Sequence, residues 1–139
     1  MRQPRYRSTE HTADLGLVAY GETPKETFEN AAYGMFDLMV DVSSTAETEA
    51  VDVRAEADDA PSLLVAFLNE LLFLFETRRL VLVRFEVIEW DEATNLLARA
   101  WGSPLAEQEP RDQIKAVTYH DMRVEKTDEG FEAEVLFDV

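Results

Sequence analysis

The sequence predicts an α+β fold in which two helices pack on a largely antiparallel β-sheet. The hydrophobic pattern predicts strands, a helix, a strand, a second helix and then several strands, an order typical of this class. Hydrophobic residues make up 46% of the chain, as in globular proteins. A chain of 139 residues is long enough to bury a core, so we expect a single domain over residues 1–139.

Three strands are predicted in the first half of the chain. Residues 5–10 are polar and are expected to be extended. Residues 15–20 are mostly apolar and predict a buried strand that Gly21 closes. After the first helix and a turn-rich link at 42–49, apolar and charged residues alternate over 51–56, which is typical of a half-buried strand.

The first helix is predicted over residues 24–40. Thr23 can cap its start, Pro24 suits the first helical position, and Glu26 can complete a capping box. Apolar residues then recur at helical spacing and predict one buried face. They are Phe28, Ala31, Ala32, Met35 and Met39, with Phe36 and Leu38 widening the stripe.

A second helix is predicted to begin at Asp58-Asp59-Ala60-Pro61, where the acids lie at the positive end of the helix dipole. From Leu63 to Phe75 nearly every side chain is apolar, which indicates a central helix. Asn69 and Glu70 are the polar residues of this run. One interpretation places both on the rim, hydrogen-bonded or solvated, and we favour it for Glu70 because acids are rarely buried without a partner.

The second half of the chain predicts further strands joined by turns. One face of the first is formed by Val81, Val83, Phe85 and Val87, followed by Ile88 and Trp90. The next segments are a turn at 91–95, a hairpin partner at 96–101, a loop at 102–112, a strand at 114–119, and a closing hairpin of 122–126 and 131–139.

The last strand alternates clearly between an apolar and an acidic face. The apolar face comprises Phe131, Ala133, Val135, Phe137 and Val139. The other face comprises Glu132, Glu134 and Asp138, together with Leu136. Because the core would hold the apolar face, we expect Asp138 to point away from it.

The charge pattern and the absence of cysteine exclude several classes of site. The formal net charge is −16, from 29 acidic and 13 basic residues, and there is no basic run. Tight direct binding to RNA or DNA, which needs clustered Lys and Arg, is therefore not expected. The same composition also fits a salt-adapted organism. Without cysteine there is no disulfide, thiolate zinc site or Cys nucleophile, as is common in a reducing cytoplasm.

Neither a signal peptide nor a membrane span is expected. Residues 1–5 lack the apolar centre of a signal peptide. The apolar run at 63–75 is shorter than the ~20 residues that cross a bilayer. We therefore expect a cytoplasmic protein.

The segment His11-Thr12-Ala13-Asp14-Leu15-Gly16 contains the best candidate for a functional ligand. Asp14 lies at the start of a predicted buried strand, so packing of that strand in the core can fix its position while its side chain faces outward. The chain ends in Asp138 and Val139, and Val139 carries the terminal carboxylate. If the last strand lies beside the strand of Asp14, three oxygen donors could converge on Ca²⁺, Mg²⁺ or Mn²⁺. Spacing alone favours ordinary solvated acids.

The two histidines leave several roles open. His11 and His120 could be metal ligands, general bases or hydrogen-bonded structural residues. The chain has no nucleophile elbow, Gly-rich phosphate loop or His-Glu-x-x-His motif, so no catalytic residue is expected. We interpret His11 as ordering the Asp14 loop and His120, beside Asp121, as lying at a turn between strands.

Five motifs, in order along the chain, resemble the archease family. They are His11-Thr12-Ala13-Asp14-Leu15-Gly16, Ala31-Ala32-Tyr33-Gly34-Met35-Phe36, Leu68-Asn69-Glu70-Leu71-Leu72, Lys115-Ala116-Val117-Thr118-Tyr119-His120 and the terminal Asp138-Val139. The resemblance implies a small acidic α+β protein that is not itself an enzyme. It also implies a partner, the RtcB-type RNA ligase of tRNA splicing and RNA repair.

The resemblance further implies how such a protein would act. It would promote guanylylation of the ligase, restore multiple turnover and broaden the nucleotides that the ligase accepts. Its metal site would consist of Asp14, Asp138 and Val139, with calcium as the bound ion. Two other functions stay open: a general acidic chaperone or adaptor without a metal, and a stand-alone metal-dependent hydrolase built on His11, Asp14 and His120.

Overall fold

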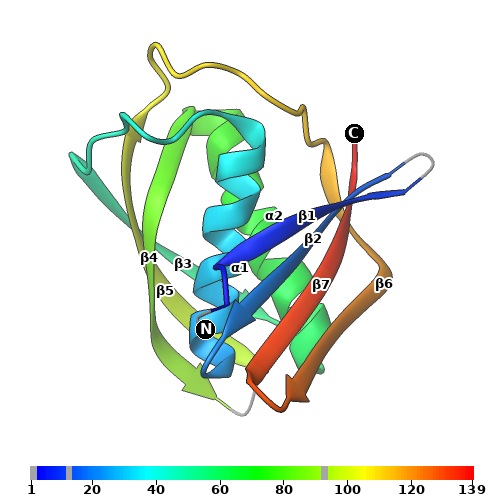
Figure 1. The fold of residues 1–139 in the computed structure, drawn as a ribbon. Coiled ribbons are helices and arrows are strands. Elements are labelled where there is room, and N and C mark those ends of the chain that lie inside the picture. Colours follow the sequence, from blue (N-terminus) through cyan, green and yellow to red (C-terminus); the bar gives the residue numbers. More distant parts are fainter. Residues whose placement is uncertain (1–2, 12–13, 92–93) are drawn as a thin grey trace.

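The structure is a computed structural model that describes residues 3–11, 14–91 and 94–139. These residues form seven strands and two helices (Figure 1). In chain order they are β1 (Tyr6–His11), β2 (Asp14–Gly21), α1 (Pro24–Met39), β3 (Glu49–Glu56), α2 (Ala60–Arg78), β4 (Leu80–Asp91), β5 (Asn95–Pro104), β6 (Ala116–Thr127) and β7 (Gly130–Asp138).

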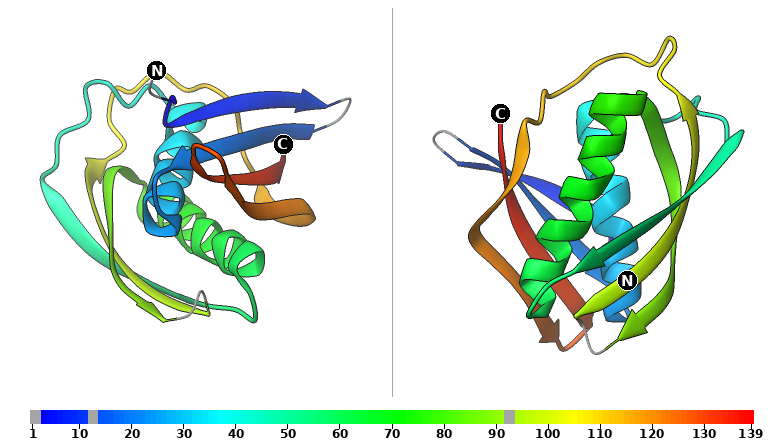
Figure 2. Two further views of the ribbon diagram at one scale, coloured as in Figure 1. Left: turned by 60° about the horizontal axis from the view of Figure 1, so that its bottom comes forward. Right: turned by 180° about the vertical axis from the view of Figure 1, so that it is seen from behind.

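The strands form two antiparallel sheets, and the helices lie between them (Figure 2). The first sheet has the order β1-β2-β7-β6, and the second has the order β3-β5-β4. Helix α1 packs on β2 and β4, and α2 packs on β6 and β3. The predicted α+β class with antiparallel pairing is confirmed, and its strands divide between two sheets. Two layers of strands are needed because each helix has apolar side chains on more than one side.

The predicted start of α1 is confirmed. Glu26 N donates to Thr23 Oγ1 at 3.1 Å, and Pro24 occupies the first turn. The Glu26 carboxylate reaches back and accepts a hydrogen bond from Glu22 N at 3.0 Å. This arrangement satisfies backbone donors that the first helical turn leaves unpaired.

Helix α2 is central over its first three turns and more exposed near its end. Asp59 caps it by accepting from Ser62 N at 2.9 Å, and residues 63–65 are buried. Phe73, which the sequence places in the same apolar run, is 58% exposed. Among the described residues, this helix alone has the length and apolar composition that a membrane-crossing helix would need, which its place between two sheets also explains.

The polar residues of α2 lie on the rim, as predicted. Asn69 Nδ2 donates to Val117 O at 3.1 Å, and Asn69 Oδ1 accepts from Val117 N at 3.0 Å. This side chain therefore takes the place of a neighbouring strand at the edge of β6. Glu70 is exposed to solvent.

Two strands depart from the predicted alternation because they contain bulges. In β4 the register against β5 shifts between Leu82 and Arg84, so that Val83 is half-buried rather than part of the buried face. In β6 the register shifts between Thr118 and Arg123. The predicted turn at His120 and Asp121 between two strands is therefore wrong, because these residues lie in a bulge of one continuous strand.

Candidate metal-binding site

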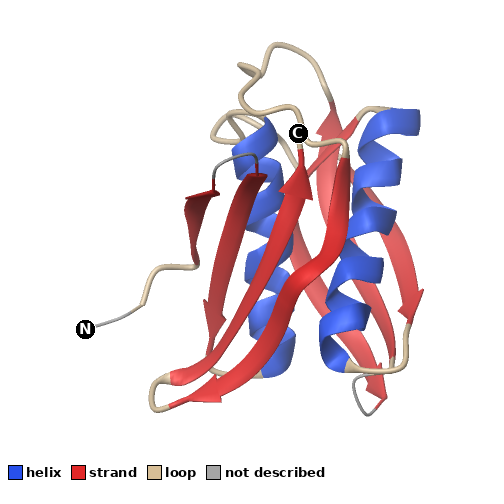
Figure 3. Cartoon of the chain, turned by 90° about the vertical axis from the view of Figure 1, so that its right-hand side faces the viewer, coloured by secondary structure: helices blue, strands red, loops and turns tan. Residues whose placement is uncertain are grey.

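Asp14 and Asp138 lie at the same end of two neighbouring strands. Strand β2 pairs with β7, and Leu15 lies opposite Phe137. Asp14 precedes Leu15 and Asp138 follows Phe137, so the next position of the antiparallel register brings the two acids side by side. Figure 3 shows β7 ending beside the start of β2. The last strand therefore lies beside the strand of Asp14, as the predicted site requires.

Both carboxylates belong to the outer face of the first sheet. Leu17 and Phe137 are fully buried in the core between the sheets. Because side chains alternate along a strand, Asp14 and Asp138 project from the opposite face. Val139 follows directly and is 51% exposed, so the terminal carboxylate lies at the same corner. Lys115 N donates to Asp138 O at 2.8 Å and fixes the end of β7 from its other side.

Other acids of this outer face are already engaged by arginine. Arg123 bonds Glu134 through Nε at 3.0 Å, and its other nitrogens reach Glu132 at 2.7 Å and Glu125 at 3.1 Å. This group covers the sheet beside Val18, which is fully buried. These three acids are therefore paired with Arg123 and are not candidates for binding a ligand.

Asp14 and Asp138 differ from these acids in their contacts with the described residues. Within the described ranges, neither side chain forms a hydrogen bond or an ion pair. The described residues contain no group of three or more His, Cys, Asp or Glu side chains placed to hold a metal. A site here would therefore need the terminal carboxylate of Val139 as a further donor. Hard, unpaired oxygen donors suit Ca²⁺, Mg²⁺ or Mn²⁺, so the residues present fit such an ion.

The two histidines are not brought together as a catalytic pair by the described residues. The side chain of His11, like residues 12 and 13, lies outside the described part of the structure. The backbone of His11 pairs with Asp14 in the β1–β2 hairpin. His120 is 75% exposed and its Nε2 lies 3.3 Å from Asp121 Oδ2, so its contact is within the β6 bulge.

One hydroxyl next to the candidate site was not singled out from the sequence. Thr9 pairs with Gly16, two residues along β2 from Asp14. Thr9 Oγ1 is buried and has no hydrogen-bond partner among the described residues. The sequence signal was slight, because Thr9 is one of several polar residues in β1.

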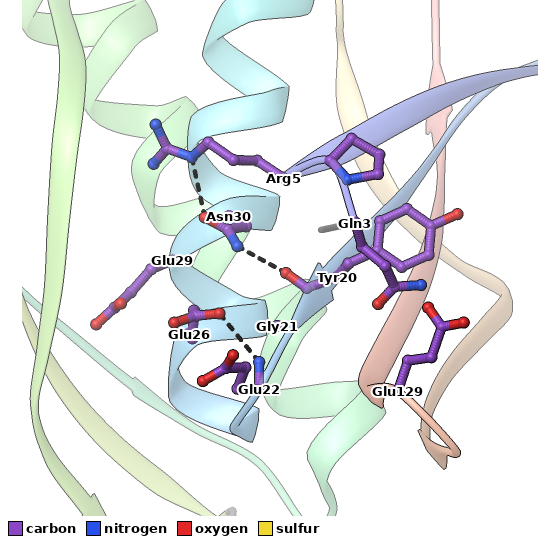
Figure 4. Close-up of a pocket in the computed structure, with 10 residues that line it drawn as sticks. Gln3, Arg5, Tyr20, Gly21, Glu22, Glu26, Glu29, Asn30 and Glu129 are labelled. Carbon is purple, nitrogen blue, oxygen red and sulfur yellow. Dashed lines mark hydrogen bonds between the residues drawn. The ribbon is translucent and has the colours of Figure 1, made fainter. Parts of the chain in front are cut away.

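A hollow lies at the other end of β2. It has a volume of about 910 Å³ and opens beside Tyr20 and Gly21 (Figure 4). Asn30 bridges its wall by accepting from Arg5 Nε at 3.0 Å and donating to Tyr20 O at 2.6 Å. The remaining lining residues are Gln3, Pro4, Glu22, Glu26, Glu29 and Glu129.

Two acids of this hollow, Glu26 and Glu29, have structural partners. Glu29 accepts a hydrogen bond from Val87 N at 2.8 Å, and burial raises the pKa of its carboxyl. Glu26 serves the helix cap. The helical spacing of these two acids and Glu22 was the sequence signal that could have revealed an acidic face here.

Comparison with known proteins points to one family. Residues 6–139 match the model of the Archease protein family. "Protein archease" of Thermococcus gammatolerans is 42% identical over 130 residues, covering 91% of this chain and 92% of that protein. "Protein archease" of Methanosarcina acetivorans is 41% identical over 140 residues, covering 97% and 96%.

Two solved structures share the fold. The solution structure of protein 1598 of Methanobacterium thermoautotrophicum is 36% identical, with a TM-score of 0.83 over 97% of this chain and 99% of that one. The crystal structure of an archease of Thermotoga maritima, described as a possible chaperone, is 20% identical. Its TM-score is 0.66 over 100% of this chain and 98% of that one, a likeness that concerns the fold alone.

Proposed function

This chain belongs to the archease family, and from that membership we propose that it activates an RtcB-type RNA ligase in tRNA splicing and RNA repair. It acts in the cytoplasm as an accessory protein and does not join RNA itself. It promotes guanylylation of the ligase, sustains multiple turnover and broadens the nucleotides that the ligase uses.

The charge of the chain supports a role through a protein partner. A formal net charge of −16 makes direct binding to phosphate backbones unfavourable. A ligase that binds RNA and nucleotides needs basic surfaces, and opposite fields would speed its encounter with this protein. This attraction weakens as salt is added, because exposed charges are screened.

The site that we propose for this role is the corner formed by Asp14, Asp138 and the carboxylate of Val139. The observation that supports it is the β2–β7 register, by which two acids that have no side-chain partner among the described residues lie side by side on one face. Together these oxygens would hold Ca²⁺, or another hard cation such as Mg²⁺ or Mn²⁺. A bound cation would supply positive charge at this corner. The chain's own part is to orient its three carboxylates toward the active site of the ligase.

A guanylylation time course of the cognate ligase tests this function. It compares the ligase alone with the ligase plus wild-type protein, Asp14→Asn, Asp138→Asn or Glu129→Gln. The Glu129→Gln variant makes the same charge change at the other end of the strand pair. We expect wild-type protein and the control to accelerate guanylylation, and the two Asp variants to lose roughly tenfold or more of that effect. Chelator should reproduce the loss.

Equal acceleration by all four folded proteins would contradict the site, and no acceleration by wild-type protein would contradict the function. Each variant is checked for folding by circular dichroism, so that loss of activity is not confused with loss of structure. Repeating the assay at several salt concentrations tests the electrostatic part of the proposal, which requires slower activation as salt rises.

One observation favours a second candidate, an acidic chaperone or adaptor without a metal. Phe73 and Tyr119 are 58% and 59% exposed, which gives the surface apolar side chains that could contact an unfolded client. This function predicts that removing residues 138 and 139 leaves activation of the ligase intact. It also predicts that substoichiometric amounts suppress the aggregation of unrelated proteins.

A further inference from the structure

Among the described residues, Thr9 has a buried hydroxyl without a partner, two register positions along the β1–β2 ladder from Asp14. Thr9 Oγ1 is shielded from solvent and accepts or donates no hydrogen bond within the part of the chain that the structure describes. Buried polar groups in folded proteins nearly always have a partner, so a solitary one calls for an explanation. Thr9 itself is partly buried, and it belongs to β1, the edge strand of the first sheet.

The position of this hydroxyl depends on a glycine in the neighbouring strand. Thr9 and Gly16 are opposite one another in the β1–β2 ladder. A Cβ atom at Gly16 would collide with Thr9 Oγ1 and would lie 3.0 Å from Leu136 Cδ2. The Thr9 side chain therefore occupies space that only a glycine leaves open, and its hydroxyl lies over β2.

The same register places the hydroxyl on the face of the sheet that carries both candidate acids, two positions away from them. Gly16 lies two residues from Asp14 along β2, and its partner Leu136 lies two residues from Asp138 along β7. Residues two apart in a strand share a face and are separated by roughly 7 Å. Thr9 Oγ1 thus lies on the outer face, on the inward side of the corner where the carboxylates project. A short Asp side chain and one water can span such a gap.

We propose that Thr9 is a positioning residue for the cation site, whose hydroxyl donates a hydrogen bond to the Asp14 carboxylate or to a water on the bound ion. This inference rests on the proposed function, because it assumes that Asp14 binds a cation. Hydrogen bonds to the groups around a metal orient its ligands and raise its affinity. Gly16 contributes to the same arrangement, because the absence of a side chain at this residue leaves the space in which the Thr9 hydroxyl lies.

A purely structural Thr9 makes a different prediction. If the side chain only fills the space over Gly16, then valine, which has nearly the same shape, should serve as well. Valine would even remove an unsatisfied buried hydroxyl, which is neutral or favourable for folding. Serine keeps the hydroxyl and removes only a methyl group. The pair Thr9→Val and Thr9→Ser therefore separates hydrogen bonding from packing.

The experiment measures Ca²⁺ binding to the full chain by calorimetry, with unfolding by urea in chelator as a second readout. We expect Thr9→Val to be as stable as wild-type protein without metal and to bind Ca²⁺ roughly tenfold more weakly. Thr9→Ser should bind within about twofold of wild-type protein, while Asp14→Asn should show little or no binding.

The Asp14→Asn arm distinguishes failure of this inference from failure of the proposed function. If Asp14→Asn loses Ca²⁺ but Thr9→Val binds as wild-type protein does, the role of Thr9 is wrong and the cation site stands. Equal binding by Asp14→Asn and wild-type protein would overturn both. If Thr9→Val is destabilised without metal, Thr9→Ser decides: weakened Ca²⁺ binding by a folded Thr9→Ser would overturn the hydroxyl's role.

Discussion

The two ends of the β2–β7 strand pair both carry acids, but the acids are used differently. At the Gly21 end, Glu26 and Glu29 accept hydrogen bonds from backbone N–H groups, at 3.0 Å and 2.8 Å. At the opposite end, the side chains of Asp14 and Asp138 have no such partner in the described chain. The hollow at the first end has a volume of about 910 Å³, yet two of the acids that line it already hold a helix start and a strand in place.

The difference teaches that neither acid count nor cavity size identifies a site in this protein. A chain with 29 acidic residues will gather carboxylates at many places by composition alone. Carboxylates that satisfy backbone donors are part of the fold, because losing them leaves buried groups unpaired. Carboxylates at strand ends that have no side-chain partner among the described residues are the better candidates for binding a ligand. The comparison therefore indicates a structural role for Glu26 and Glu29 at the Gly21 end, while the ligand binding that we propose belongs to the Asp14 end.

The largest expected effect is a loss of stability at the Gly21 end. Gly130 has φ of 135°, and a Cβ there would collide with Gly21 O. Gly130→Ala should therefore lower the free energy of unfolding by about 3 kcal/mol, measured by urea denaturation. Glu129→Ala, in the same turn, is the control and should change it by less than about 0.5 kcal/mol. An unchanged midpoint for Gly130→Ala would contradict the packing described for this turn.

The next effect concerns the Asp14 end and appears only with metal. Calcium at about 100 times its dissociation constant should stabilise wild-type protein by about 2.7 kcal/mol. Asp14→Asn and Asp138→Asn should fold but lose this gain, which thermal unfolding with and without chelator measures. Glu129→Gln should keep it. If the stabilisation by calcium disappeared in Glu129→Gln and persisted in the two Asp variants, the ion would bind at the Gly21 end, which would contradict the proposed site.

A smaller loss of stability is expected from the cap of α1. Thr23→Ala removes the oxygen that accepts from Glu26 N and should cost about 1 kcal/mol. Thr23→Ser keeps the acceptor and should lie within a few tenths of a kcal/mol of wild-type protein. Both variants should gain the same stability from calcium as wild-type protein does. Coupling between the cap and the calcium effect would show that the two ends are not independent.

The smallest effect is a change in pH dependence. Burial raises the pKa of the Glu29 carboxyl in the folded state above its ordinary value, so the folded chain holds this proton to higher pH than the unfolded chain. Stability contributed by the protonated form is therefore lost as pH rises through the folded pKa. Glu29→Gln keeps an acceptor for Val87 N but cannot ionise.

Urea denaturation of both proteins between about pH 4 and about pH 8 measures this difference. The stability of wild-type protein relative to Glu29→Gln should fall as pH rises from the lower limit. Parallel curves for the two proteins would show that Glu29 does not titrate differently on folding.

Local features of the fold could be predicted from the sequence. The cap at Thr23, the span of α1 and the alternation of β7 each depend on residues close together in the chain, and all three are confirmed. The division into two sheets could not be predicted, because it depends on which strands pair with one another on each side of the two helices. The β6 bulge was predicted as a turn, because a polar His120-Asp121 pair is compatible with either a turn or a bulge.

Some residues of the candidate site could likewise be predicted from the sequence, and others could not. Asp14 and Asp138 could be chosen from their places at strand ends, and the fold brings those ends together. The choice of a cation and of a ligase partner came from the family resemblance and stays a prediction. Thr9 could not be found from sequence, because the burial of its hydroxyl depends on the missing side chain of Gly16 in the neighbouring strand.

The most direct test of the central claim is a Mn²⁺ titration of the isotope-labelled protein followed by NMR. Mn²⁺ broadens the resonances of nuclei close to it, so the pattern locates the ion without any assay of the ligase. We predict that broadening at substoichiometric Mn²⁺ is centred on the amides of Asp14, Lys115, Asp138 and Val139, and that Ca²⁺ reverses it. Broadening centred on Glu22, Glu26 and Glu129, or spread evenly over the acidic surface, would contradict the account.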